Sequence, residues 1–298
     1  MPYVTTHDKT ELFYKDWGSG PAVLFLHGWP LSSDSWDDQA MAVAAAGYRA
    51  IAYDRRGFGR STQSWAGYDY DSLSDDLAAV IEQTGARDVT LVGFSMGGGE
   101  VARYMHRHHG KSVIRAALVS SVVPCMLKSD SNPDGTDAAV FDDMAQALRE
   151  DRAAFFSGFF KDFYGVSLIS HPVSSELLRW SERIAMQASL KATLACAKSF
   201  ATTDFRSDLA SFQIPTLIIH GTDDKTVPID ASARAAAHGI AGAQLIEYEG
   251  APHGLIATAK DRLTQDLLAF LGQAPALPIA AAPPIAPSYD LSIGRAAA

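Results

Sequence analysis

Cysteine is nearly absent from this chain: its 298 residues include only Cys125 and Cys196, and these two do not have C-x-x-C spacing. Such sparse cysteine fits a reducing compartment. Basic residues are also few, because 25 lysines and arginines stand against 34 acidic residues, for a net charge of -9. Nucleic acids and anionic membranes need a basic surface, so we expect neither as a partner.

Long apolar runs and a secretory leader are missing as well. No apolar run reaches the length of a membrane-spanning helix. The start, Met1–Thr6, lacks the basic and apolar regions of a signal peptide. We therefore expect a cytoplasmic protein. Its 47% hydrophobic and 20% charged residues are ordinary for a globular protein with a large core.

What the sequence does contain is a series of strands that alternate with helices. Apolar runs, typical of strands covered on both faces, occur at 22–26, 49–53, 89–92, 116–119, 216–220 and 244–248. Helical patterns occur at about 36–46, 71–83, 229–237 and 258–271. Residues 12–17 predict an antiparallel edge strand. The alternation predicts an α/β fold, a mostly parallel sheet with helices on both faces.

The alternation stops near Ser121 and resumes at Pro215. The chain between them shows only helical patterns, which is typical of a cap that covers a binding site. We therefore predict an α/β core at 1–120, a helical cap at 121–210, the second part of the core at 211–272, and an Ala/Pro-rich, disordered tail at 273–298.

The segment Gly93-Phe94-Ser95-Met96-Gly97 lies between a predicted strand and a predicted helix. In that setting G-x-S-x-G predicts a nucleophile elbow, a strained turn that presents its serine. The flanking glycines are expected because strand and helix approach too closely for a Cβ atom. The first N–H groups of the helix suit the negative charge that develops in acyl transfer. We predict Ser95 as the nucleophile.

A serine, then an acid after a later strand, then a histidine after the last strand is the chain order of a hydrolase triad. His253 follows the last predicted strand and is the predicted base. The loop after residues 216–220 offers two adjacent acids, Asp223 and Asp224. Each candidate follows a strand, at the edge where open α/β sheets place their sites. Chain order alone does not choose between the two acids.

Six motifs together resemble the cofactor-free haloperoxidase, perhydrolase and arylesterase branch of the α/β-hydrolases. They stand at 27–30 (HGWP), 53–61 (YDRRGFGRS), 93–97 (GFSMG), 203–209 (TDFRSDL), 220–228 (HGTDDKTVP) and 250–254 (GAPHG). The resemblance covers the chain from Tyr3 to about Leu271. It implies the α/β-hydrolase fold with an all-helical cap insertion. It also implies that Asp224 is the catalytic acid and that Asp223 is a solvated loop carboxylate.

The oxyanion hole is expected to have two backbone donors. One is the N–H of Met96, the residue after the nucleophile, and the resemblance makes the N–H of Trp29 the other. Family members with Trp-Pro at this place resemble those with good perhydrolase activity, in which the Trp29 carbonyl would accept a hydrogen bond from hydrogen peroxide. Pro30 then fixes where that carbonyl points. The alternative is that Pro30 only stiffens the loop.

Aromatic side chains are expected to form the substrate pocket. Phe155, Phe156, Phe159, Phe160 and Phe163 lie at helical spacing, and each either packs in the core or lines the pocket. The predicted pocket residues are Trp29, Pro30, Phe94, Phe141, Phe159, Phe163, Val227 and Leu255.

The resemblance implies a serine hydrolase that acts on small carboxylic esters through an acyl-enzyme and needs no metal or other cofactor. Its partners would be an ester or acid substrate and hydrogen peroxide, and family members are often trimers or larger. Peracid made from peroxide would oxidise halide in solution. The alternatives are opening of γ-lactams by the same triad, and a ligand receptor without catalysis. Dehalogenation and epoxide opening require an aspartate nucleophile where this chain has Ser95.

Three further features have simpler explanations. Asp54, Arg55 and Arg56 are expected to form charge pairs within a structural loop rather than an anion site. His106, His108 and His109 lie at the end of the elbow helix with a spacing that matches no zinc pattern. Cys125 follows a strand next to the elbow, but no base accompanies it.

Overall fold

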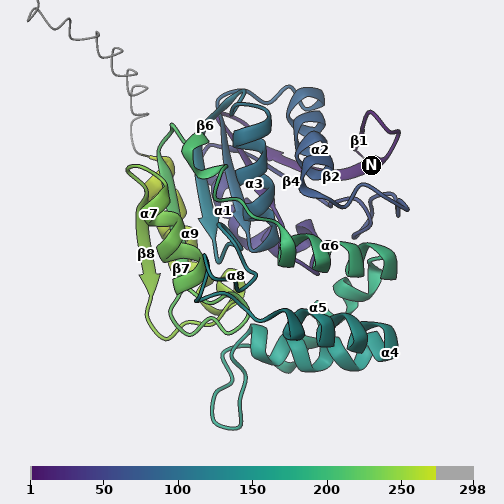
Figure 1. The fold of residues 1–298 in the computed structure, drawn as a ribbon. Helices are drawn as coiled ribbons and strands as arrows, with labels where there is room; N and C mark the ends of the chain where they lie inside the picture. Colours follow the sequence, from purple (N-terminus) through teal and green to yellow (C-terminus); the bar gives the residue numbers. More distant parts are fainter. Residues whose placement is uncertain (1, 273–298) are drawn as a thin grey trace, which may run out of the picture.

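The structure is a computed structural model, and it describes residues 2–272. The tail predicted at 273–298 lies outside the described residues. A single eight-stranded sheet organises the described chain, in the order β1-β2-β4-β3-β5-β6-β7-β8 (Figure 1). The strands are β1 Tyr3–Thr5, β2 Glu11–Gly18, β3 Ala22–Leu26, β4 Arg49–Tyr53, β5 Val89–Phe94, β6 Val113–Val119, β7 Thr216–Gly221 and β8 Gln244–Tyr248.

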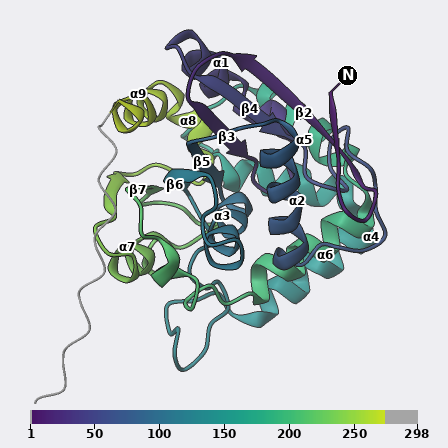
Figure 2. The same cartoon turned by 90° about the horizontal axis from the view of Figure 1, so that it is seen from above.

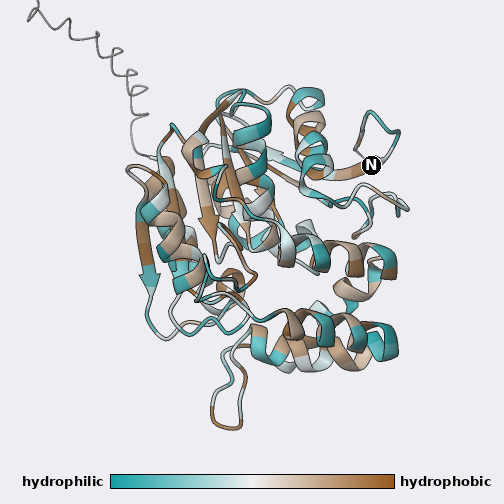
Figure 3. Cartoon of the chain, in the orientation of Figure 1, coloured by the Kyte–Doolittle hydropathy of each residue, from teal (hydrophilic) through white to brown (hydrophobic). Residues whose placement is uncertain are grey.

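The sheet is parallel from β4 through β8, whereas β1 and β2 add an antiparallel edge. The central strands β3 and β5 are buried along their whole length, as their continuous apolar runs predict. Figure 3 shows this apolar character along the strands of the sheet. The mostly parallel sheet inferred from the sequence is confirmed.

Helices cover both faces of the sheet (Figure 2). Helices α1 (Asp37–Ala45) and α9 (Lys260–Leu271) pack together on one face, and α2 (Tyr70–Gln83) packs with α3 (Met96–Arg107) on the other. The shorter elements are η1 Ser33–Trp36, η2 Leu209–Ser211, η3 Asp230–Arg234, α7 Ala235–Gly239 and α8 Leu255–Thr258. Within residues 2–272, no helix is both long and apolar enough to cross a membrane.

Three helices, called the cap helices below, lie between β6 and β7: α4 Ala138–Phe163, α5 Ser175–Gln187 and α6 Leu190–Thr202. In Figure 1 they lie beyond the ends toward which the parallel strands point, with α6 nearest the sheet. Helix α4 is kinked at Asp151, whose backbone is not helical (φ -152°, ψ 89°). The Asp151 carboxylate accepts a hydrogen bond from the N–H of Ala154 at 2.9 Å, so it caps the second half of the helix.

Some element boundaries differ from the sequence-based prediction. Strand β6 begins three residues before the predicted 116–119, because Arg115 interrupts its apolar run. The predicted helix 229–237 consists of a π-helical turn, Asp230–Arg234, followed by α7. The predicted helix 258–271 is confined to α9, since Ala259 leaves the helical region (φ -133°, ψ 32°). Strand β1 was not predicted, because three residues are too few to show a periodic hydrophobic pattern.

Candidate active site

Ser95 occupies the sharp turn between β5 and α3. Its backbone has φ 53° and ψ -117°, a conformation that side-chain-bearing residues rarely adopt. Its N–H still donates to the carbonyl of Val119 in β6 at 2.8 Å, which fixes the turn against the sheet. A Cβ atom on Gly93 would lie 2.6 Å from the Gly97 carbonyl oxygen, and one on Gly97 would lie 2.5 Å from that of Leu26. The two glycines of the motif are therefore required by packing.

A continuous series of hydrogen bonds joins Ser95, His253 and Asp224. Oγ of Ser95 lies 3.0 Å from Nε2 of His253, and Nδ1 of His253 lies 2.7 Å from Oδ2 of Asp224. The three residues follow β5, β8 and β7, whose carboxyl ends meet at one edge of the sheet. All three are buried. Asp223, the alternative acid, is exposed on the same loop.

The carboxylate of Asp224 accepts hydrogen bonds at both oxygens. Oδ1 accepts the backbone N–H groups of Thr226 at 2.9 Å and Val227 at 2.7 Å. Burial alone would raise the pKa of this carboxyl, but the charge of His253 and hydrogen bonds from His220 and His253 hold the pKa well below its usual range. Asp224 is thus ionised at neutral pH.

The loop after β3 passes directly beside the serine. A Cβ atom on Gly28 would lie 3.0 Å from Cβ of Ser95 and 2.6 Å from the ring of Phe94, so only glycine fits there. The N–H of Leu31 donates to the Gly28 carbonyl at 2.9 Å and closes the loop into a tight turn. The indole N–H of Trp29 donates to the carbonyl of Thr193 in α6 at 3.1 Å. The cap therefore anchors the residue predicted to supply an oxyanion donor.

Ser95 opens into a cavity of about 510 Å³ between the sheet edge and the cap helices. Most of its wall is apolar, and four of the eight predicted pocket residues line it: Trp29, Phe141, Phe159 and Val227. Phe155 and Phe200 extend the aromatic wall. The charged side chains in the lining, Asp143, Asp162 and Lys225, are exposed to solvent. The site is a mainly apolar space with a polar opening.

The other four predicted pocket residues are buried and are not part of this cavity lining: Pro30, Phe94, Phe163 and Leu255. The rings of Phe94 and Phe163 pack on the His253 imidazole, with centroid distances of 5.2 and 4.8 Å. They support the imidazole rather than meet a ligand. Helical spacing groups the phenylalanines by face but does not show which of them reach the cavity.

This chain is similar to known proteins over most of its length. Residues 21–259 match the family described as the alpha/beta hydrolase fold. This chain belongs to that family. A non-heme chloroperoxidase of Kitasatospora aureofaciens is 44% identical over 92% of this chain and 100% of its own length. A bifunctional esterase/perhydrolase of Acinetobacter calcoaceticus is 43% identical over 91% and 99%. The crystal structure of a Bacillus anthracis bromoperoxidase has a TM-score of 0.88 and 41% identity, over 91% and 99% of the two chains. The inferred branch of α/β-hydrolases is confirmed.

This α/β-hydrolase has a second buried histidine at its acid. Nε2 of His220 lies 3.1 Å from Oδ2 of Asp224 and 2.9 Å from the carbonyl oxygen of Val227, so a single N–H is placed between two acceptors. Nδ1 of His220 has no hydrogen-bond partner among the described residues, and the side chain is fully buried. His220 belongs to the motif at 220–228, but its place in the sequence does not predict a role for it.

A buried ionic network connects helix α3 to the loop that follows β3. Arg55 donates from Nη2 to the His27 carbonyl at 2.6 Å and from Nε to the Glu100 carboxylate at 2.5 Å. Nε2 of His27 accepts the backbone N–H of Arg55 at 3.0 Å, so Nδ1 is the donor to the Gly28 carbonyl at 2.9 Å. Burial and the Arg55 charge hold the pKa of His27 well below its usual range, which keeps this imidazole neutral.

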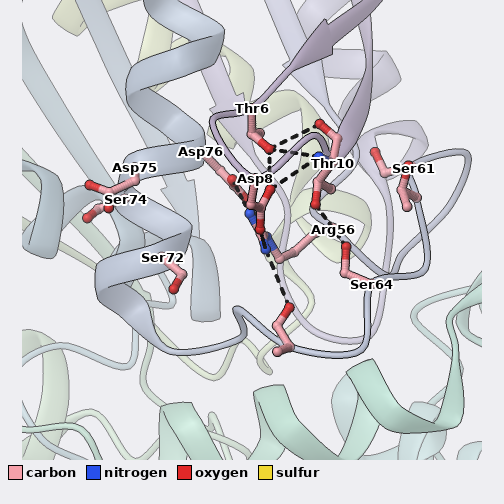
Figure 4. A network of polar contacts seen from close by, with 12 residues as sticks. Thr6, Asp8, Thr10, Arg56, Ser61, Ser64, Ser72, Ser74, Asp75 and Asp76 are labelled. Atoms are coloured by element: carbon pink, nitrogen blue, oxygen red, sulfur yellow. Dashed lines mark hydrogen bonds and ion pairs between the residues drawn. The ribbon is translucent and has the colours of Figure 1, made fainter.

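The predicted pairing within the loop at Asp54, Arg55 and Arg56 is only partly right. Asp54 pairs inside the loop with Arg60 at 2.8 Å, but Arg55 and Arg56 reach other elements. Figure 4 shows Arg56 between Asp76 of α2, at 2.6 Å, and Asp8 of the β1–β2 turn, at 2.7 Å. Arg56 therefore fastens the edge of the sheet to α2. Burial raises the pKa of Asp76 to about 6 despite this pairing.

The remaining predicted features lie away from the cavity wall. His108 lies 2.9 Å from Asp75, and His106 lies 3.3 Å from the hydroxyl of Ser211. Over residues 2–272, no three His, Cys, Asp or Glu side chains are grouped as metal ligands. Cys125 is buried and does not line the cavity, although its neighbour Met126 does.

Proposed function

We propose that this chain is a serine esterase for small carboxylic esters and that its acyl-enzyme reacts with either water or hydrogen peroxide. The observation that carries the proposal is the series from Ser95 through His253 to Asp224, whose serine opens into an apolar cavity. The relatives named as an esterase/perhydrolase and as haloperoxidases support both outcomes.

Acylation begins at the Ser95 hydroxyl. Nε2 of His253 takes its proton while Oγ attacks the ester carbonyl, and Asp224 stabilises the imidazolium that forms. The resulting oxyanion is held by the N–H groups of Met96 and Trp29. His253 then protonates the departing alcohol, and the acyl group stays on Ser95 as an ester. The first of these proton transfers joins Oγ of Ser95 and Nε2 of His253, which lie 3.0 Å apart.

Deacylation repeats the same proton transfers with a different nucleophile. Water attacks the acyl-serine and releases a carboxylic acid. Hydrogen peroxide attacks the same carbonyl and passes one proton to His253. His253 returns that proton to Oγ of Ser95 as the bond between Oγ and the acyl carbon breaks, and the acyl group leaves as a peracid, RCO₃H. The peracid oxidises bromide in solution to hypobromous acid and is itself reduced to the carboxylic acid. Halogenation then follows from acyl transfer.

The cavity indicates the substrate class. About 510 Å³ with a wall that includes Trp29, Phe155 and Phe159 suits a small or aromatic acyl ester. Asp143, Asp162 and Lys225 form a charged, exposed part of the cavity lining. The polar end of a substrate would lie there, in contact with water.

The test is Ser95→Ala, with Ser74→Ala as a matched control because Ser74 is buried on α2 and bonds only the nearby Asp71 carbonyl. Hydrolysis of p-nitrophenyl acetate and peroxide-dependent bromination of monochlorodimedone are measured on the same preparations. Ser95→Ala should lose both activities, and Ser74→Ala should keep both. Bromination that survives without Ser95 would contradict the shared acyl-enzyme.

A further inference from the structure

Two thioethers line the cavity into which Ser95 opens. Met126 comes from the segment after β6, and Met144 comes from α4. The protein shields Met126 almost completely, at 2% exposure, and half-buries Met144. Neither side chain has a part in the acyl transfer proposed above. A thioether is nevertheless among the side chains most readily oxidised, and it becomes a sulfoxide.

We propose that Met126 and Met144 are modification sites, which the enzyme oxidises with the peracid that it forms on Ser95. This inference rests on the proposed perhydrolysis. A sulfur lone pair attacks the outer peroxy oxygen of RCO₃H, and the O–O bond breaks. The peroxy proton passes to the carboxylate, so RCO₂H leaves. The sulfur loses two electrons and the peroxy oxygen gains them, and hydrogen peroxide is the original oxidant.

Confinement makes these two sulfurs the first targets. A single peracid molecule in a cavity of about 510 Å³ is present at a concentration of roughly 3 M. Met41 and Met186 are far more exposed, at 62% and 40%, but they meet the peracid only after it has diluted into the solution. Among these four methionines, the two that line the cavity should therefore be oxidised before the two that are more exposed.

Oxidation of these methionines would limit the number of turnovers that the enzyme completes with peroxide. A sulfoxide places a polar oxygen in a wall shared with Phe141, Phe155 and Phe200. Burying that oxygen without a donor opposes the binding of an apolar acyl group. The KM for an aromatic ester should rise several-fold as turnovers with peroxide accumulate, and methionine sulfoxide reductase should restore it.

The experiment compares two sources of peracid by peptide mass spectrometry. Wild-type protein turns over an acetate ester with hydrogen peroxide, with free methionine present to consume released peracid. Ser95→Ala, which cannot form peracid, receives the same total amount of peracetic acid without free methionine. We expect Met126 and Met144 to be oxidised before Met41 and Met186 in the first sample, and the reverse in the second. The fully buried Met96 and Met105, which do not line the cavity, are internal controls.

A second measurement uses the double variant Met126→Leu/Met144→Leu, because leucine nearly conserves volume and cannot be oxidised in this way. Relative to its own initial rate, it should retain activity for several-fold more turnovers with peroxide than wild type does. The same order of oxidation in both samples would overturn this inference and leave perhydrolysis standing. Absence of peracid from the wild-type reaction, followed through bromide oxidation, would overturn both proposals.

Discussion

His220 shares the carboxylate oxygen of Asp224 that also binds His253: its Nε2 lies 3.1 Å from Oδ2, and Nδ1 of His253 lies 2.7 Å from it. The same N–H of His220 faces the carbonyl of Val227, whose own N–H donates to Oδ1 at 2.7 Å. His220 thereby fixes the orientation of the acid and of the loop that carries it. Because its ring lies behind Asp224, we treat it as a positioning residue.

His220→Phe should lower kcat roughly three- to tenfold, since the loss of one hydrogen bond to the acid corresponds to about 0.5–1.5 kcal/mol. An Asp224 with one donor fewer attracts the proton on His253 more strongly. The acid limb of the kcat/KM profile should therefore move to higher pH. The measurement is the pH dependence of p-nitrophenyl acetate hydrolysis.

His220→Gln is the matched variant, because its amide N–H₂ can take the place of the Nε2–H donor. It should restore the acid limb to the wild-type position and recover most of kcat. If both variants lose activity equally and neither moves the acid limb, His220 serves only to fill space in the core.

Asp224→Asn should reduce kcat by about 10⁴, because an amide at this place favours the wrong imidazole tautomer of His253. Asp223→Asn is the matched control, one residue away and exposed, and it should change kcat less than twofold. Both rates come from p-nitrophenyl acetate hydrolysis. Equal losses at the two positions would show that the acid has been assigned to the wrong residue.

Glu100→Gln should destabilise the fold by about 3–5 kcal/mol, because it leaves the buried Arg55 without its counter-charge. Glu247→Gln breaks the exposed pair with Arg234 and should cost only about 0–1 kcal/mol. Urea unfolding measures both differences. A loss at Glu100 no larger than that at Glu247 would mean that the network does not hold α3 to the loop after β3.

Local sequence patterns were enough to identify the candidate site residues that lie in a short motif directly after a strand. Ser95 has a glycine on each side at fixed spacing, and His253 is the only histidine after the last strand, so their meeting follows from the parallel order of the sheet. The same reasoning could not choose between Asp223 and Asp224, because both stand in one loop. The choice needed the resemblance to a family, and the hydrogen bond from His253 agrees with it.

The supporting residues could not be found in this way, because their partners are distant in sequence. Glu100 resembles any polar residue on a helix until its bond to Arg55, 45 residues away, is seen. The α4 phenylalanines show the same limit: Phe159 faces the cavity, whereas Phe163 packs on His253. Helical spacing predicts an apolar face, but the kink at Asp151 and the packing of α4 decide what each ring meets.

The loop that contains Trp29 is placed to affect whether water or hydrogen peroxide attacks the proposed acyl-enzyme. Trp29 lines the cavity, and its indole is anchored to α6. Gly28 lies against Ser95, so the backbone of this loop is close to the acyl group in the proposed mechanism. The ring of Pro30 disfavours helical backbone at Trp29, and this restricts the direction of the Trp29 carbonyl.

Pro30→Leu should lower peracid formation relative to hydrolysis by several-fold to about tenfold, because one orienting hydrogen bond to peroxide corresponds to about 0.5–1.5 kcal/mol. Leucine lacks the ring that restricts the backbone of Trp29, so the Trp29 carbonyl no longer has one direction. Ser95, His253 and Asp224 keep their contacts, and ester hydrolysis should therefore persist. The measurement is the ratio of peracetic acid formed to ester hydrolysed at fixed peroxide, for wild type and variant. An unchanged ratio would show that Pro30 only stiffens the loop and that preference for peroxide arises elsewhere in the cavity.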